Sequence, residues 1–282
     1  MKFAERMFLL QYGAERVVHS LSIRDGTPRL YWEPFVGVLV YSGDRWILFD
    51  TGLAQDAVAD AGVHASYRET ALERGADELE QWRLSPAPPA AGTWLWTRPG
   101  DPLLSALGDV GVSVGDLDCA VVSHFHLDHS GGIRTLADAG VSVLVGERDL
   151  QVTLGEPVAG SAVHRPDWRD ARTDWRPLSG DVEIAPGVTL LATPGHTPGH
   201  TSLMVRLPES GTWIFAADAA DLAQNLHEGR CCGSTFPDDQ FETAQESLDR
   251  LLDLAASEDA RLIPGHDQVV FNAAKHPLRG HR

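Results

Sequence analysis

The sequence predicts a layered protein of β-strands and α-helices whose functional side chains gather at one edge of a sheet. Four apolar segments with the length of buried strands each run into a tight turn that carries histidine or aspartate. The carboxyl ends of such strands are a usual place for catalytic groups in layered α/β proteins. The chain has 282 residues, of which 43% are hydrophobic, so it can bury a full core as one large domain over residues 1–282.

The first of these segments carries the strongest pattern in the chain. Residues 117–123 (LDCAVVS) have the composition of a buried strand, and residues 124–129 (HFHLDH) follow them directly. Residues 130–132 (SGG) then allow a sharp turn into a helix that we expect from about Ile133. Three imidazoles and one carboxylate in so short a loop are costly to bury unless a cation lies among them.

The spacing within this loop predicts two cations rather than one. His124 and His126 are two residues apart, so both side chains can point the same way and hold one ion. Asp128 and His129 are adjacent, so their side chains diverge, which suits them to a second ion nearby.

The other three segments supply further candidate ligands. They are residues 190–200 (LLATPGHTPGH), 213–218 (WIFAAD) and 261–267 (RLIPGHD). Each pairs an apolar strand with a turn that ends on a side chain able to bind metal, namely His196 or His200, Asp218 and His266. The repetition indicates ligands that converge on one edge of a sheet.

Together these motifs resemble those of the metallo-β-lactamase superfamily. Residues 49–52 (FDTG) also match its early strand-plus-DTG signature, and the resemblance covers roughly residues 30–272. It implies an α+β fold, an αββα sandwich of two facing mixed β-sheets flanked by helices, with a binuclear metal site at one edge. It further implies a weak internal duplication. Residues 43–50 (GDRWILFD) and 211–218 (GTWIFAAD) both show the order turn, Trp-Ile, apolar strand, Asp.

The resemblance implies a role for each candidate ligand. It assigns to one metal ion His124, His126 and His196, to the other Asp128, His129 and His266, and to a bridge between them Asp218. In the Gly-His repeat it favours His196 over His200, and it places His200 and Asp50 where hydrogen bonds support the ligands. Asp128 is the expected catalytic residue, because it would hold a hydroxide shared by the two metals and pass its proton to the leaving alkoxide. Imidazole and carboxylate ligands fit two divalent ions, with zinc expected first and Mn, Fe or Co as alternatives.

The same resemblance narrows the expected reaction. His126 stands where the redox diiron branch has Glu, and this favours a hydrolase. Asp218 stands where the β-lactamases with this motif have Cys, so it points to lactonases, glyoxalase-type thioesterases or phosphodiesterases rather than to antibiotic hydrolysis. Four segments also resemble the N-acyl homoserine lactonase group, namely residues 8–13, 32–40, 46–53 and a helix of about 241–256.

We therefore expect a hydrolase that opens the lactone ring of N-acyl homoserine lactones, a quorum-quenching activity, by attack of a metal-bridging hydroxide. The alternative is hydrolysis of another ester, thioester or lactone at the same site. One position departs from the lactonase pattern, because the tyrosine usual three residues after the bridging aspartate is here Asp221. A carboxylate donates no hydrogen bond unless protonated and repels a developing oxyanion. Either another donor serves, or the substrate differs.

Two segments are expected to elaborate the sandwich, besides an N-terminal extension over residues 1–30. Residues 54–100 contain an expected helix at about 66–82 and a loop with Trp94 and Trp96, which would line a substrate pocket, form a dimer contact or pack against outer helices. The loop-like residues 221–239 are a second candidate for substrate contacts. The resemblance also suggests a homodimer.

Composition limits the expected partners to a small-molecule substrate. The net charge of −17 opposes approach to nucleic-acid phosphates and gives no attraction to anionic lipids. No run reaches the roughly 18 apolar residues of a membrane helix, and the apolar patch near the N-terminus is too short for a signal peptide. The three cysteines fit a reducing cytoplasm, with Cys119 and the Cys231-Cys232 pair expected to be buried or in loops.

Overall fold

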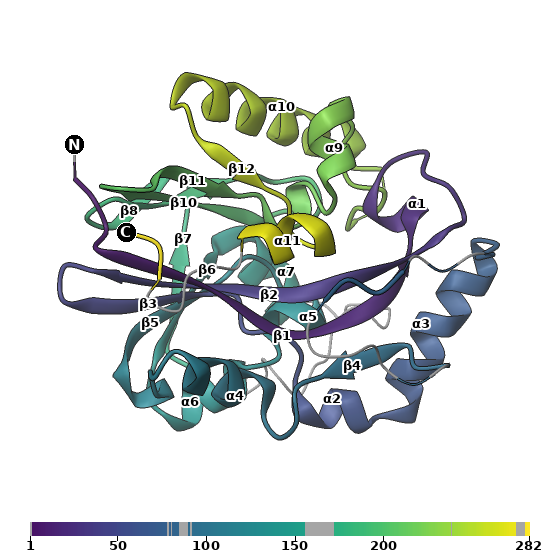
Figure 1. The fold of residues 1–282 in the computed structure, drawn as a ribbon, viewed down its shortest axis with the longest axis horizontal. Coiled ribbons are helices and arrows are strands. Elements are labelled where there is room, and N and C mark those ends of the chain that lie inside the picture. Colours follow the sequence, from purple (N-terminus) through teal and green to yellow (C-terminus); the bar gives the residue numbers. More distant parts are fainter. Residues whose placement is uncertain are drawn as a thin grey trace.

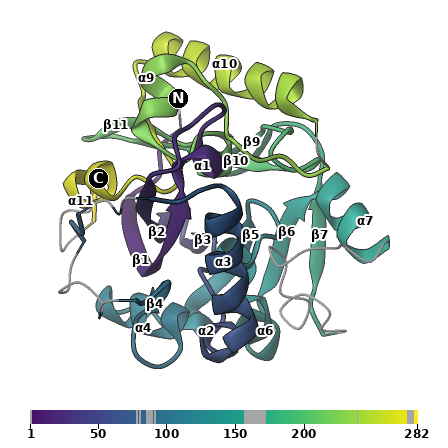
Figure 2. The ribbon, with the colours of Figure 1, turned by 90° about the vertical axis from the view of Figure 1, so that its right-hand side faces the viewer.

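Two β-sheets lie face to face, with helices against the outer face of each, in the computed structural model of the chain (Figures 1 and 2). The structure describes residues 2–77, 79, 81–84, 90, 92–155, 172–237, 239–274 and 280–282. This is the α+β, αββα arrangement that the resemblance implied. Within the described residues, no helix is both long enough and apolar enough to span a lipid bilayer.

The larger sheet has seven strands. Their order across the sheet is β4 (Leu95–Thr97), β1 (Arg6–Val18), β2 (Leu30–Ser42), β3 (Arg45–Phe49), β5 (Leu117–Val122), β6 (Ser142–Gly146) and β7 (Trp175–Leu178). β1 and β2 are each 13 residues long and pair antiparallel along most of their length, so the N-terminal segment is part of this sheet. From β3 to β7 the strands run parallel. Apart from the exposed Asp118 near its start, β5 is apolar and buried, which fits a strand that is covered on both faces.

The smaller sheet has five strands and repeats part of the first. Their order is β12 (Arg261–Ile263), β11 (Gly211–Phe215), β10 (Thr201–Leu207), β9 (Val188–Ala192) and β8 (Val182–Ala185). The β10–β11 hairpin is followed along the chain by β12, which lies parallel to β11. The β2–β3 hairpin has the same relation to β5, which comes after β4 in the chain and lies parallel to β3. This shared topology matches the duplication read from the two Trp-Ile segments.

Alternate residues along each central strand separate the inner core from the outer one. In β3, Ile47 packs between the sheets with Val121 and Leu203, whereas Leu48 packs against the helices outside the larger sheet. Those outer helices are α2 (Gln55–Ala59), α3 (Ala61–Glu73), α4 (Pro102–Asp109) and α6 (Ile133–Asp138). The smaller sheet is covered by α9 (Ala223–Glu228) and α10 (Phe241–Ser257), as Figure 1 shows.

The remaining helices of the described residues are short and lie close to the ends of strands. They are α1 (His19–Ser22), α5 (Leu127–Ser130), α7 (Glu147–Gly155) and α11 (Gln268–Ala274). Two further turns are 3-10 helices, η1 (Val114–Asp116) and η2 (Ala217–Ala219). The short α5 and η2 follow β5 and β11, so they carry side chains at the carboxyl ends of the strands.

The helix expected at about 66–82 was wrong in its bounds. α3 begins at Ala61, because the Asp60 side chain accepts a hydrogen bond from the Gly62 N–H and caps the helix. It ends at Glu73, just before Gly75 adopts a positive φ of 75°. Residues 85–89 and 91 of the expected loop lie outside the described residues.

The tryptophans of this segment form an aromatic cluster on the larger sheet. Trp82 meets the rings of Trp32 and Trp96 edge-on, at centroid distances of 5.0 and 5.7 Å. Trp94 lies beside the guanidinium of Arg16, 5.6 Å from the ring centroid. Of the three alternatives read from the sequence, packing on the sandwich accounts for these contacts, although the partner is a sheet rather than outer helices.

Candidate metal centre

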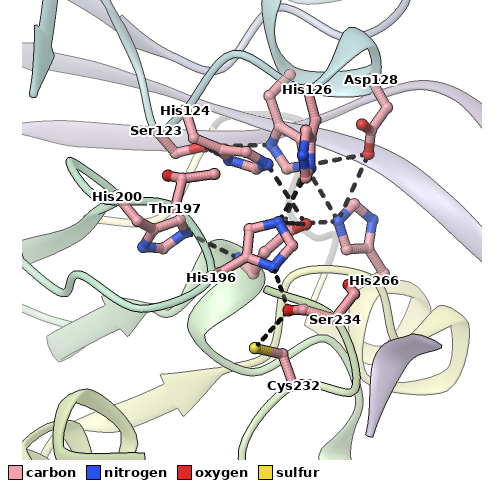
Figure 3. Close-up of polar contacts among 12 residues, drawn as sticks. Ser123, His124, His126, Asp128, His196, Thr197, His200, Cys232, Ser234 and His266 are labelled. Atoms are coloured by element: carbon pink, nitrogen blue, oxygen red, sulfur yellow. Dashed lines mark hydrogen bonds and ion pairs between the residues drawn. The ribbon is translucent and has the colours of Figure 1, made fainter. Parts of the chain in front are cut away.

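Side chains from both sheets converge at the carboxyl ends of four strands (Figure 3). After β5 the chain presents His124 and His126 and then enters α5, where a helical turn rather than an extended loop holds the next two side chains. The loop after β9, the η2 turn after β11 and the turn after β12 add one side chain each. The converging residues are His124, His126, Asp128, His129, His196, Asp218 and His266.

The donor atoms fall into two groups, within each of which all atoms lie within 4.8 Å of one another. One group contains His124, His126, His196 and Asp218, and the other contains Asp128, His129 and His266. Asp218 lies between them. Its Oδ1 atom is 3.0 Å from Nε2 of both His129 and His266, and its Oδ2 atom is 3.3 Å from Nε2 of His196. The two groups are therefore adjacent and share one carboxylate.

The donor set fits divalent cations. Nε2 of His196 lies 2.9 Å from Nδ1 of His126, and Nε2 of His129 lies 3.2 Å from Nε2 of His266. Nε2 of His124 is buried and has no hydrogen-bond partner among the described residues. Burying imidazole nitrogens that face one another with no hydrogen bond between them costs free energy. A cation that binds between them would satisfy all of them at once.

Two of these histidines are fixed by backbone carbonyls through their outward nitrogens. Nδ1 of His196 donates to the Ser234 carbonyl at 3.1 Å, and Nδ1 of His266 donates to the Pro34 carbonyl at 3.0 Å. These bonds set the tautomer and turn both Nε2 atoms toward the centre. The buried Cys232 thiol donates to the same Ser234 carbonyl at 3.2 Å (Figure 3), and Cys119, Cys231 and Cys232 are all free and buried.

His200 lies close to this cluster but directs neither nitrogen into it. Its Nε2 accepts the backbone N–H of Asp218 at 3.1 Å, so its Nδ1 carries the proton and donates to the Thr193 carbonyl at 3.1 Å. One ring nitrogen thus holds the Asp218 turn, and the other anchors the ring to Thr193. Of the two histidines in the Gly-His repeat, the structure thus brings His196 into the cluster.

Asp50 contacts His129 on the side of the ring that faces away from the cluster. Its Oδ2 lies 2.9 Å from Nδ1 of His129, and its Oδ1 accepts the Ser123 N–H at 2.7 Å. In Asp50→Asn, the amide oxygen can keep the Ser123 bond, but the NH2 group then faces the His129 N–H, so donor meets donor. We expect a loss of about 10- to 100-fold in metal affinity or activity.

Metal titration and steady-state kinetics of this variant test the role of Asp50. The exposed Asp253→Asn in α10 is the matched control, because it makes the same chemical change far from the cluster. Metal affinity and turnover that match those of Asp253→Asn would show that Asp50 does not orient the ring.

Buried charges within the cluster stabilise one another. Burial opposes protonation of His129, but the carboxylates of Asp128, Asp218 and Asp50 outweigh it and raise the pKa of this imidazole well above its usual value. Burial likewise opposes ionisation of Asp218, and the surrounding histidines, led by His129, nevertheless hold its pKa well below the ordinary range. The centre therefore favours ionised carboxylates with positive charge among them, which is the environment that a cation site requires.

The cluster opens onto a cavity of about 290 Å³. His126, Asp128, His196, Asp218 and His266 line it from the cluster, and part of the expected loop 221–239 also lines it, through Asp221, Ser234, Thr235 and Phe236. Neither Trp94 nor Trp96 is among the lining residues. The described part of the tryptophan loop is thus not the wall of this cavity.

Asp221 is buried at the edge of the cavity. Its backbone carbonyl accepts the His266 N–H at 2.7 Å, and in the part of the chain that the structure describes its Oδ1 atom has no hydrogen-bond partner. Burial and the nearby Asp218 carboxylate raise the pKa of the Asp221 side chain well above its usual value.

Sequence analysis did not single out several of the lining residues, among them Glu15, Glu33 and Tyr67. Each of these three lies in a strand or helix with no metal motif nearby. The available signal was a glutamate within each of two strongly apolar strand sequences, RMFLLQYGAERVV and LYWEPFVGVLVYS. Such a residue breaks the apolar pattern expected of a covered strand.

The Gly-His loop is also held by a buried aspartate in α7. Asp149 accepts the Thr197 hydroxyl at 2.7 Å and the Gly199 N–H at 2.5 Å. Burial raises its pKa from the ordinary 3.8 to about 6 despite these bonds. The folded chain then binds this proton more tightly than the unfolded chain, so the Asp149 contribution to stability is full below about pH 4 and is lost as the pH rises to about 6.

Asp149→Asn removes this titration. Between about pH 4 and pH 7, we expect the free energy of unfolding of the variant to fall by up to about 3 kcal/mol less than that of the wild type. Paired urea titrations of the two proteins, both with chelator present, measure the change. Parallel stability curves for variant and wild type across this range would contradict the assignment.

The fold and the convergent His and Asp side chains define a class of metal-dependent αββα proteins. The family model of the metallo-beta-lactamase superfamily matches residues 35–266. The chain belongs to this superfamily, as its motifs implied.

Curated relatives and solved structures of lactonases resemble the chain further. An N-acyl homoserine lactonase of Bacillus thuringiensis is 29% identical over 171 residues, which are 59% of this chain and 62% of that protein. The match thus spans less than two thirds of that relative. The N-acyl homoserine lactonase AttM of Azorhizobium caulinodans is 26% identical over 278 residues, 96% of each chain. A solved N-acyl homoserine lactone hydrolase with N-hexanoyl-L-homoserine at its catalytic metal centre has a TM-score of 0.78, with 24% identity and 96% of both chains covered.

Proposed function

We propose that this chain is a binuclear metal-dependent hydrolase that opens the lactone ring of N-acyl homoserine lactones. The observation that carries the proposal is the pair of adjacent donor groups that share Asp218 and line one cavity. We assign His124, His126 and His196 to one ion, Asp128, His129 and His266 to the other, and Asp218 to both. Zinc is the proposed metal, since neutral imidazoles and carboxylates suit it.

The relatives support the substrate class. Proteins described as N-acyl homoserine lactonases are similar to this chain in sequence, and one of them along nearly its whole length. A solved structure with the same fold holds a ring-opened N-acyl homoserine at its metal centre. A small acylated lactone is therefore the substrate that we propose for the cavity.

The residues divide the chemistry between them. Bound divalent ions lower the pKa of water toward neutrality and polarise a carbonyl oxygen. Asp128 lines the cavity and lies 3.0 Å from Nε2 of His129, so its carboxylate is placed to accept the proton of the attacking water. The same proton then passes from Asp128 to the alkoxide oxygen that leaves when the ring C–O bond breaks. His200 holds the Asp218 backbone, and the Asp218 carboxylate fixes the position of the two donor groups relative to each other.

Asp221 favours one alternative, hydrolysis of a different ester, thioester or lactone at the same centre. The lactonases that the motifs resemble usually have a tyrosine at this position, and a carboxylate there presents different hydrogen-bonding chemistry to the oxygen atoms of a lactone. This alternative changes the substrate and leaves the metal centre and the hydrolytic step unchanged.

Steady-state assays of the metal-loaded protein on a panel of substrates test the proposal. The panel contains acyl homoserine lactones, unsubstituted lactones, glutathione thioesters, phosphodiesters and β-lactams. We expect kcat/KM to be highest for the acyl homoserine lactones. Thioester turnover far above lactone turnover would replace the proposed substrate, and metal analysis of the purified protein identifies the ion.

A further inference from the structure

Two glutamates face each other inside the larger sheet. Glu15 of β1 and Glu33 of β2 are direct cross-strand partners, and their side chains are only 6% and 2% exposed. Like charges directly opposite in a sheet are destabilising, and burial adds a desolvation cost. Burial raises the pKa of both carboxyls, that of Glu33 to about 8. The pair therefore does not stabilise the sheet. A role in binding would explain why two carboxyl groups are buried at this position.

The two carboxyl groups are only partly satisfied by the protein. The Ser22 hydroxyl donates to Oε1 of Glu33, and the Tyr67 phenol forms a hydrogen bond with Glu15. The Oε2 atom of Glu15 has no hydrogen-bond partner within the described ranges. Among the described residues, no Lys or Arg forms an ion pair with either glutamate, and the neighbouring Arg16 guanidinium packs over the Trp32 ring at 4.9 Å.

Both glutamates line the cavity onto which the candidate metal centre opens. The backbone carbonyl of Pro34, the residue after Glu33 in β2, accepts the Nδ1–H of His266. The glutamate pair therefore lies one residue away from a contact with the candidate metal centre. A second acceptor that no described residue pairs, Oδ1 of Asp221, is also buried at this cavity. Divalent ions held beside the cavity would lower the raised pKa values of the glutamates and leave carboxylates that only accept hydrogen bonds.

We propose that Glu15 and Glu33 form a subsite that accepts a hydrogen bond from an N–H group on the lactone substituent, such as the amide of an N-acyl chain. The inference rests on the proposed lactone-hydrolase function, and it names the residues that would select the substrate. A buried acceptor left unpaired is costly, so a site of this kind rejects analogues that lack the donor. The subsite thus separates amide-bearing lactones from lactones with a purely alkyl or keto substituent.

Two matched compounds test the subsite on the metal-loaded protein. One is N-hexanoyl homoserine lactone, and the other is the analogue in which CH2 replaces the amide N–H. Calorimetry measures the Kd of their ring-opened acids, and kinetics measures kcat/KM of the lactones. A hydrogen bond to a buried acceptor that is otherwise left unpaired predicts a preference for the amide of at least about tenfold in both quantities.

Glu15→Gln and Glu33→Gln keep the side-chain shape and replace a hydrogen-bond acceptor with a donor. The existing donors, Tyr67 and Ser22, hold the amide oxygen, so the NH2 group takes the position of the free carboxylate oxygen and faces the substrate N–H. We expect the preference for the amide to fall below about threefold in each variant, with the CH2 analogue bound as in the wild type. The exposed Glu246→Gln in α10 is the matched control and keeps the full preference.

The outcomes separate the subsite from the proposed function. A wild-type preference below about twofold in Kd overturns the subsite without any variant, and equal losses for both compounds in the variants overturn it as well. If neither lactone is hydrolysed but the Kd preference is present and is lost in the variants, the lactone-hydrolase proposal fails and the donor-binding subsite holds.

Discussion

Asp218→Ala is expected to lower lactone hydrolysis on the order of 10³-fold and to leave the protein with fewer than two metal ions per chain. Asp218 lies within 3.3 Å of nitrogen atoms in both donor groups, so its loss removes a ligand from each proposed ion. Metal ions contribute several kcal/mol to hydrolytic transition states, and each 1.4 kcal/mol corresponds to about a tenfold change in rate. Mass spectrometry of the native protein and steady-state kinetics measure the two effects.

Asp253→Ala is the control for this substitution, because Asp253 is exposed on α10. It should retain both metals and full activity. Complete loss of activity in Asp218→Ala with both ions still bound at wild-type affinity would contradict the bridging role, although Asp218 would remain important for catalysis.

Gly195→Ala is expected to destabilise the fold by about 3 kcal/mol, near the upper end of overpacking effects, and to reduce activity as well. Gly195 has a φ of 134°, and a Cβ atom there would lie 2.3 Å from the backbone of Ala244 in α10. Helix backbone cannot give way as a flexible side chain can. The next residue is His196, so any displacement of this turn moves a proposed metal ligand.

Gly180→Ala separates this clash from the strain of a positive φ alone. Gly180 has a φ of 71°, and a Cβ atom there would meet nothing within 4 Å. Its substitution should cost only about 1–2 kcal/mol, the penalty for a left-handed residue with a side chain. Urea denaturation of both variants gives the comparison, and equal losses of stability would show that the contact with α10 is not what requires glycine at 195.

Much of the proposed centre could be predicted because each candidate side chain lies in a local strand-and-turn motif. The segment 261–263 forms β12 as expected, and residues 117–122 of the expected strand form β5. The motif residues of the cluster depend on short-range spacing, which a sequence displays directly. His200 shows the limit of this reasoning, because only its contacts with Thr193 and the Asp218 N–H separate it from His196.

The substrate side of the cavity could not be predicted in the same way. Glu15 and Glu33 are 18 positions apart in the sequence and face each other only through the register of β1 and β2. Strand register depends on pairing and burial along the whole sheet rather than on a local motif. The bounds of α3 depend on the Asp60 cap and the turn at Gly75, which periodicity alone does not reveal.

Stepwise metal reconstitution of the chelator-treated protein tests the central claim most directly. Zinc is added in fractions of one equivalent, while native mass spectrometry counts the bound ions and hydrolysis of N-hexanoyl homoserine lactone is followed in parallel. The binuclear centre built on Asp218 predicts that two ions bind per chain and that activity reaches its plateau at two equivalents. Full activity with one ion or fewer per chain, or lactone hydrolysis by the metal-free protein, would contradict it.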